Sequence, residues 1–131
     1  MLLDTSGLLC LHYPAEPFHT QAVSAYKRAA SLLTHNYVLA EYVALAHARK
    51  CDRSLALEFM TDLMDNPEIE VVWVDKALHQ SAFQLLRDRQ DKDYSLCDAV
   101  SFRLMSQRKV SEALTTDKHF EQAGFIRLLN L

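Results

Sequence analysis

The stretch MLLDTSGLL, residues 1–9, sets a single carboxylate, Asp4, in an otherwise apolar segment. Its first residues are typical of a short buried strand over 1–4, and a helix is expected over 6–12. A charge in such a segment is costly unless it is paired, hydrogen-bonded or bound to a metal. We therefore expect Asp4 either to cap the helix that follows or to be part of a functional site, and the choice depends on the other motifs of the chain.

Length and composition predict one folded domain over residues 1–131. Half of the residues are hydrophobic, and only two are Gly and three Pro, which favours a helix-rich core over disorder. No apolar run approaches the ~20 residues of a membrane span, and no signal-peptide pattern opens the chain, so we expect a cytoplasmic protein with no membrane partner.

Cysteine usage and net charge add little about function. The chain has three widely spaced cysteines, Cys10, Cys51 and Cys97. An odd number with no close pair predicts reduced thiols and argues against a zinc site. The formal net charge of −3 gives no bulk attraction to nucleic acid. It does not exclude a nucleic-acid enzyme, because divalent cations would offset acidic residues grouped in one site.

Apolar periodicity predicts strands alternating with helices. Strands are expected over 1–4, 31–35, 69–74, 112–116 and 125–131, and helices over 6–12, 18–30, 37–50, 53–64, 76–89 and 95–109, with a helical turn over 117–124. The run IEVVWV (69–74) is the clearest strand, and Trp73 within it is expected in the core. Alternation of this kind implies an α/β fold with a parallel sheet covered on both faces.

Four acids occupy positions that suit a site. Asp4 and Asp117 each follow a strand, where the carboxyl end of the strand meets a helix. Glu41 and Asp98 lie on helices, each along an expected apolar stripe. Taken singly, each acid has a simpler explanation. Asp4 and Asp117 could each cap the helix that follows, and Asp98 would interact favourably with the dipole of its helix. Glu41 could lie at the edge of the apolar stripe with its carboxylate in water.

Together, four converging carboxylates would repel one another and raise their pKa values. A hard divalent cation relieves that repulsion, and an all-oxygen ligand set favours Mg²⁺ or Mn²⁺. Such a cluster supports phosphodiester hydrolysis, in which the metal activates a water and stabilises the leaving oxygen. The chain has no glycine-rich phosphate loop, and no Ser/His/Asp or Cys/His arrangement is evident.

Four blocks in order, LLDTSGLL, NYVLAEYVAL, DKDYSLCDAVSF and LTTDKHFEQAGF, resemble the PIN domain, and most nearly the VapC-type toxin ribonucleases of toxin–antitoxin pairs. The resemblance implies a three-layer α/β/α sandwich with a central, mostly parallel sheet, and Mg²⁺- or Mn²⁺-dependent cleavage of RNA. It assigns Asp4, Glu41, Asp98 and Asp117 as metal-binding and catalytic acids. Supporting positions implied by the same blocks are Ser6, Thr115 and Asp93.

The resemblance also implies partners. A cognate antitoxin is expected to lie across the helices at 18–30 and 37–50, which carry Phe18, Tyr26, Tyr37, Tyr42 and Leu45, and a homodimer is expected. Clustered cations most often belong to a solvated face.

Among the cations, Arg49, Lys50 and Lys118 are better candidates for phosphate contacts, because their segments adjoin the expected site. His119, two residues after Asp117, could face the substrate, but an ordinary surface histidine is the favoured interpretation.

Two other functions are weighed against a nuclease. A PIN-like RNA-binding or scaffold domain without catalysis is disfavoured, because no expected acid is missing. A haloacid-dehalogenase-like phosphatase would need an Asp where this chain has Ser6, and a response-regulator receiver would need a phospho-accepting Asp and a late Lys that are not evident. The RNA that is cut, the cut site, the antitoxin and the number of bound metals are not readable from the sequence.

Overall fold

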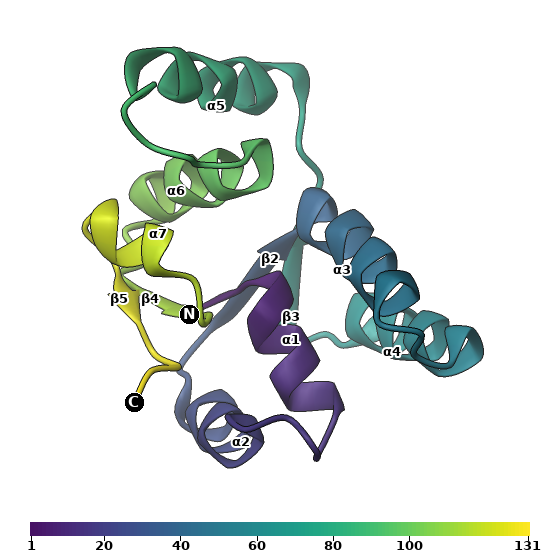
Figure 1. Ribbon diagram of the computed structural model, residues 1–131. Coiled ribbons are helices and arrows are strands. Elements are labelled where there is room, and N and C mark those ends of the chain that lie inside the picture. Colours follow the sequence, from purple (N-terminus) through teal and green to yellow (C-terminus); the bar gives the residue numbers. More distant parts are fainter.

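A computed structural model describes the whole chain, residues 1–131 (Figure 1). Its elements, in chain order, are β1 (Leu2–Leu3), α1 (Thr5–His12), α2 (His19–Arg28), β2 (Leu32–His35), α3 (Asn36–Ala48), α4 (Arg53–Asp65), β3 (Ile69–Val72), α5 (Lys76–Asp88), α6 (Leu96–Arg108), β4 (Glu112–Leu114), α7 (Lys118–Gln122) and β5 (Ile126–Arg127). None of these helices is long and apolar enough to span a bilayer.

The five strands form one parallel sheet in the order β3-β2-β1-β4-β5. β1 lies at its centre, where Leu2 pairs with Leu33 of β2 on one side and with Ala113 of β4 on the other. Because all strands are parallel, their carboxyl ends meet at one edge of the sheet. Asp4 follows β1 at that edge, so the centre of the edge is where a site is expected.

Strand residues alternate between two cores. Leu3 and Leu32 face a core built from α1, α2, α3 and α4, whereas Leu2 and Leu33 face a second core built from α5, α6 and α7. Both strands are buried on both faces, so their sequences read as continuous apolar runs. Figure 1 shows the two groups of helices on opposite sides of the sheet, which confirms the predicted α/β/α sandwich.

A close contact fixes α1 against the centre of the sheet. A side chain at Gly7 would place its Cβ 1.9 Å from the carbonyl oxygen of Leu114, so only glycine lets the helix lie directly on the backbone of β4. This approach brings the start of α1 next to the end of β4. Residues that follow Asp4 and residues that follow β4 are therefore held side by side.

Several boundaries differ from those expected. β3 ends at Val72, and β5 contains two residues where a strand over 125–131 was expected. The prediction that Trp73 lies in the core is wrong, because its side chain is 65% exposed. β3 is an edge strand, and Trp73, one residue beyond its end, belongs to neither core, whereas Val72 and Val74 on either side of it pack against the second core.

Candidate active site

The carboxyl edge of the sheet holds three of the four predicted acids on adjacent elements. Asp4 follows β1, Asp117 lies three residues after β4, and Asp98 lies in the first turn of α6. Asp4 is 5% exposed and Asp98 7%. Buried carboxylates are rare without a partner, so the surroundings of each need an explanation.

Asp4 is held by a hydroxyl and not by a helix cap. It stands at the N-cap position of α1, but its side chain makes no capping hydrogen bond. Instead, Thr115 donates its hydroxyl to Asp4 Oδ2 at 2.7 Å. Burial raises the pKa of Asp4 to about 7, and the negative charges of Asp98 and Glu41 act in the same direction. The cap interpretation of Asp4 therefore does not hold.

Thr115 and Ser6 tie the two strand ends together. The single hydroxyl proton of Thr115 goes to Asp4, so its oxygen accepts from the backbone N–H of Asp117 at 3.0 Å and lies 3.2 Å from Ser6 Oγ. Ser6 Oγ also accepts from the N–H of Thr116 at 3.0 Å. Thr115 thus contacts Asp4 and the backbone of Asp117 directly, and Ser6 contacts Thr115, while a supporting role in a reaction stays a prediction for both.

Asp98 combines a capping role with a place in the acidic group. It forms a capping box with Ser95: its Oδ2 accepts from the N–H of Ser95 at 3.1 Å, and its own N–H donates to Ser95 Oγ at 3.0 Å. Burial raises the pKa of Asp98, and the charge of Asp117 raises it further, against the hydrogen bonds from Ser95 and His119. A cap contact therefore does not exclude this carboxylate from the site.

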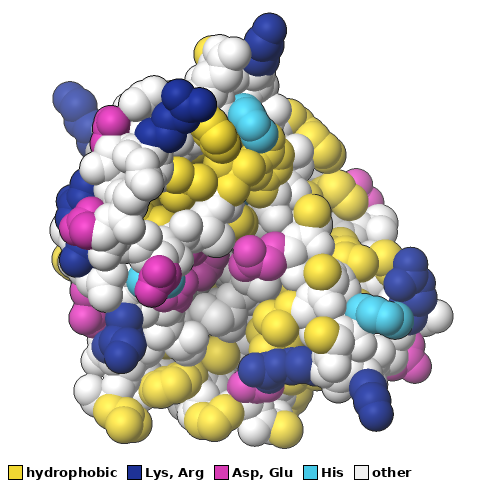
Figure 2. Space-filling model, turned by 45° about the horizontal axis from the view of Figure 1, so that its top comes forward, with side chains coloured by type: hydrophobic (Ala, Val, Ile, Leu, Met, Phe, Trp, Pro, Cys, Tyr) yellow, Lys and Arg dark blue, Asp and Glu magenta, His cyan; other side chains and the backbone are white.

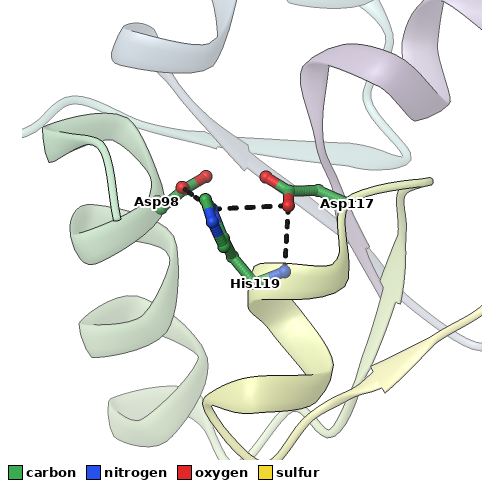
Figure 3. A group of neighbouring side chains, drawn as sticks. All are labelled: Asp98, Asp117 and His119. Carbon is green, nitrogen blue, oxygen red and sulfur yellow. Dashed lines mark hydrogen bonds and ion pairs between the residues drawn. The ribbon is translucent and has the colours of Figure 1, made fainter. Parts of the chain in front are cut away.

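Asp117 also caps a helix, since its Oδ1 accepts from the N–H of His119 at 2.9 Å at the start of α7. The second oxygen, Oδ2, makes no hydrogen bond within the chain. Asp117 is only partly buried, and it faces the same space as Asp98 (Figure 3).

Glu41 borders the group from α3. The prediction that it lies in a buried stripe is wrong: the buried face of α3 is formed by Val38, Leu39, Tyr42 and Ala46, and Glu41 is exposed. Its charge nevertheless reaches the site, because it raises the pKa of Asp4 and, after burial, that of the Cys97 thiol.

His119, for which the sequence favours an ordinary surface position, lies beside two of the predicted acids. Its Nδ1 lies 3.0 Å from Asp98 Oδ2 and 3.4 Å from Asp117 Oδ1, so the ring stands between the two carboxylates (Figure 3). Ligand atoms of Asp98, Asp117 and His119 all lie within 4.8 Å of one another. The available signal was the Asp-x-His spacing at a strand–helix junction, which places both side chains on the first turn of α7.

The remaining predicted residues lie outside the group formed by the acids and His119. Asp93 is exposed in the loop before α6, and Lys118 is exposed at the start of α7, next to Asp117. Arg49 and Lys50 do not adjoin the acids as expected. They follow the far end of α3, about 12 Å along the helix axis from Glu41, and Arg49 pairs with Glu16 at 2.6 Å.

The donor set fits a hard divalent cation. It offers carboxylate oxygens from four side chains and one imidazole nitrogen, and burial together with mutual repulsion raises the pKa of two of the acids. Figure 2 shows acidic and histidine side chains gathered in a hollow of this face, with cations and an apolar area around it. A cation bound among these acids would neutralise the charges that burial opposes.

A fold and a site of this kind define a family, and comparison with known proteins identifies it: the chain belongs to the PIN domain family, whose model matches residues 1–126. Among its relatives is the 23S rRNA-specific endonuclease VapC20 of Mycobacterium tuberculosis, present in strains CDC 1551 / Oshkosh and ATCC 25618 / H37Rv. It is 26% identical over 129 residues, which are 98% of this chain and 97% of the relative. The crystal structure of Mycobacterium tuberculosis VapC20, described as a sarcin–ricin loop cleaving toxin, superposes with a TM-score of 0.87 at 25% identity and covers 95% of each chain.

Proposed function

We propose that residues 1–131 form one PIN-like domain that acts as a divalent-metal-dependent endoribonuclease, the toxin of a toxin–antitoxin pair. The observation that carries this proposal is the convergence of Asp4, Asp98 and Asp117 at one edge of the sheet, with Glu41 beside them and the pKa of Asp4 raised to about 7. A charge cluster of this cost is difficult to explain by structure alone, because neutral side chains would serve the caps and the core.

Each residue has a separable task. Asp4, Glu41, Asp98 and Asp117 would hold Mg²⁺ or Mn²⁺, which when bound lowers the pKa of a water and stabilises charge on the leaving oxygen. The Thr115 hydroxyl donates to the Asp4 carboxylate, and its oxygen accepts from the backbone N–H of Asp117. Ser6 contacts the same hydroxyl from α1. These contacts preorganise the acids, so that little rearrangement is needed when an RNA phosphate arrives.

The first test is cleavage of a labelled RNA pool with Mn²⁺, Mg²⁺ or EDTA. Scission is expected with either ion, and no scission is expected in EDTA or for Asp98→Asn. Asp65→Asn, an exposed acid at the end of α4, serves as the matched control and is expected to cleave like the parent. Metal binding without cleavage of any RNA would favour the alternative function, a non-catalytic PIN-like RNA-binding or scaffold domain.

The substrate class is proposed from the relatives. We expect a structured rRNA loop, since the similar VapC20 is named for 23S rRNA and its crystal structure for the sarcin–ricin loop. We place this activity in the cytoplasm, where ribosomes and reduced thiols occur. A sarcin–ricin hairpin should be cut faster than a hairpin of the same stem with a scrambled loop. Equal rates would refute this substrate and leave the nuclease proposal standing.

The proposed protein partners are an antitoxin and a second copy of the chain. A cavity of about 280 Å³ opens between α1, α2 and α4, lined by apolar residues that include Leu11, Tyr26 and Phe59, and it offers an antitoxin segment a place to dock. Tyr42 cannot take part, because it is fully buried. Co-expression with the neighbouring small gene product, followed by light scattering, should yield a complex built on a dimer of this chain. If this chain were a lone monomer both when expressed alone and when co-expressed, that result would count against both partners.

Lys118 is the best placed of the three predicted phosphate contacts. It is exposed beside Asp117, whereas Arg49 is engaged with Glu16. We expect Lys118→Ala to weaken RNA binding and to lower its dependence on salt, while Arg49→Ala leaves both unchanged.

A further inference from the structure

We propose that His119 is a direct metal ligand, and that its nitrogen makes the ion position between Asp98 and Asp117 prefer Mn²⁺ over Mg²⁺. The inference rests on the proposed metal-dependent function and goes beyond it, because the four acids alone make an all-oxygen set. It assigns a mixed nitrogen–oxygen position to one side of the acidic group and leaves Asp4 and Glu41 on the all-oxygen side.

The spacing of the three donors fits one ion. An octahedral ion with bonds of about 2.1 Å sets neighbouring ligand atoms about 3.0 Å apart and opposite ones about 4.2 Å apart. His119 Nδ1 lies 3.0 Å from Asp98 Oδ2 and 3.4 Å from Asp117 Oδ1, and the three ligand atoms lie within 4.8 Å of one another. The two distances to the imidazole nitrogen therefore fall within the octahedral range.

The imidazole is held in this orientation by its neighbours. The backbone N–H of His119 donates to Asp117 Oδ1 at 2.9 Å, and the next residue, Phe120, is fully buried and anchors α7 to the core. The buried ring of Tyr94 meets the imidazole edge-on, with centroids 5.4 Å apart. The side chain is 27% exposed, so a solvent-facing rotamer would be open to it, yet Nδ1 faces both carboxylates (Figure 3).

Donor chemistry then sets the choice of metal. Mg²⁺ takes oxygen ligands in near-ideal octahedra and keeps several waters, so a nitrogen donor in its shell is unfavourable. First-row transition ions accept imidazole, and Mn²⁺ is the weakest binder among them, which leaves it exchangeable. The competing interpretation is that His119 only hydrogen-bonds to Asp98 and stays outside the metal shell, as histidines near metal carboxylates often do. The two interpretations differ in whether a nitrogen is bonded to the ion.

The test is pulsed electron paramagnetic resonance on untagged, RNA-free protein loaded with Mn²⁺, which reports a bonded ¹⁴N nucleus directly. The parent is expected to show a histidine nitrogen coupling, His119→Gln to lack it, and His47→Gln, an exposed histidine near the end of α3, to keep it. In parallel, the Mg²⁺ concentration that displaces half of the Mn²⁺ is expected to fall about tenfold or more in His119→Gln.

Each outcome separates this inference from the proposed function. Bound Mn²⁺ with no nitrogen coupling in the parent overturns the ligand assignment and leaves the metal-dependent nuclease intact. Coupling that survives in His119→Gln also overturns it, since the nitrogen then comes from another residue. Failure of the parent to bind Mn²⁺ at all removes both this inference and the metal dependence of the proposed function.

Discussion

Replacing Asp4 with Asn should stabilise the metal-free protein at neutral and alkaline pH. Burial raises the pKa of this carboxyl from 3.8 to about 7 in the folded state. The protonated form therefore contributes stability that is fully present below about pH 3.8 and is lost as the pH rises through about 7. The pKa differs by about three units between the unfolded and folded states, and at 1.36 kcal/mol per unit this gives roughly 4 kcal/mol as the upper limit of the lost stability.

Asn is neutral, has the same shape, and can still accept the hydroxyl hydrogen bond from Thr115 through its amide oxygen. The free energy of unfolding of Asp4→Asn should thus exceed that of the parent by a few kcal/mol at pH 8, and the difference should shrink toward zero near pH 4. Urea denaturation in EDTA at several pH values measures it. Adding Mn²⁺ should stabilise the parent and have a smaller effect on the variant.

The matched control is Asp65→Asn, which removes an exposed acid at the end of α4. Its free energy of unfolding should stay parallel to that of the parent at every pH. If the difference between Asp4→Asn and the parent did not change between pH 5 and pH 8, Asp4 would be ionised in the folded state at low cost. Burial of Asp4 would then require no cation.

Three further substitutions test the packing and the support of the site. Gly7→Ala drives a Cβ into the carbonyl oxygen of Leu114, so thermal unfolding should show a free energy of unfolding lower by about 3 kcal/mol or more, or no folded protein. Parent-like stability would contradict the close contact. Thr115→Val removes the hydroxyl that donates a hydrogen bond to Asp4, so RNA cleavage should be about 10- to 100-fold slower while circular dichroism shows an intact fold. An unchanged cleavage rate would show that the hydroxyl is dispensable. Trp73→Ala should change the free energy of unfolding by less than about 1 kcal/mol, because the ring is exposed; a larger loss would place it in a buried interface.

Much of the fold is readable from the sequence because the sheet is buried on both faces. Continuous apolar runs separated by helical periodicity predict parallel strands, and the order of strands and helices follows directly. What the pattern does not contain is the position of a strand within the sheet. Trp73 follows an apolar run that is typical of a central strand, but β3 is at the edge, where the same run ends in solvent. β1, β3, β4 and β5 are shorter than predicted. Asp4 and Leu128, just beyond the ends of β1 and β5, still donate their backbone N–H groups to carbonyl oxygens of β4.

The site was predictable where an acid follows a strand and less so where it lies on a helix. Asp4 and Asp117 sit at strand ends, which parallel topology brings to one edge. Glu41 was expected to be buried, because the stripe through Tyr37 and Leu45 looked like the packing face of α3, whereas the helix is rotated to bury another. His119 meets Asp98 across 21 positions of sequence, and only the packing of α6 against α7 creates that contact.

We propose above that the carboxylates at the edge of the sheet bind a divalent cation and that this cation is needed to cleave RNA. The most direct test measures cleavage of one labelled rRNA hairpin. The protein is first stripped of metal with EDTA and then given excess Mn²⁺, and the same series is run for Asp98→Asn. No scission is expected before the metal is added, cleavage at one position is expected after it, and none is expected at any stage for the variant. Cleavage that persists in EDTA, or that Asp98→Asn retains at the parental rate, would contradict metal-dependent catalysis by these acids.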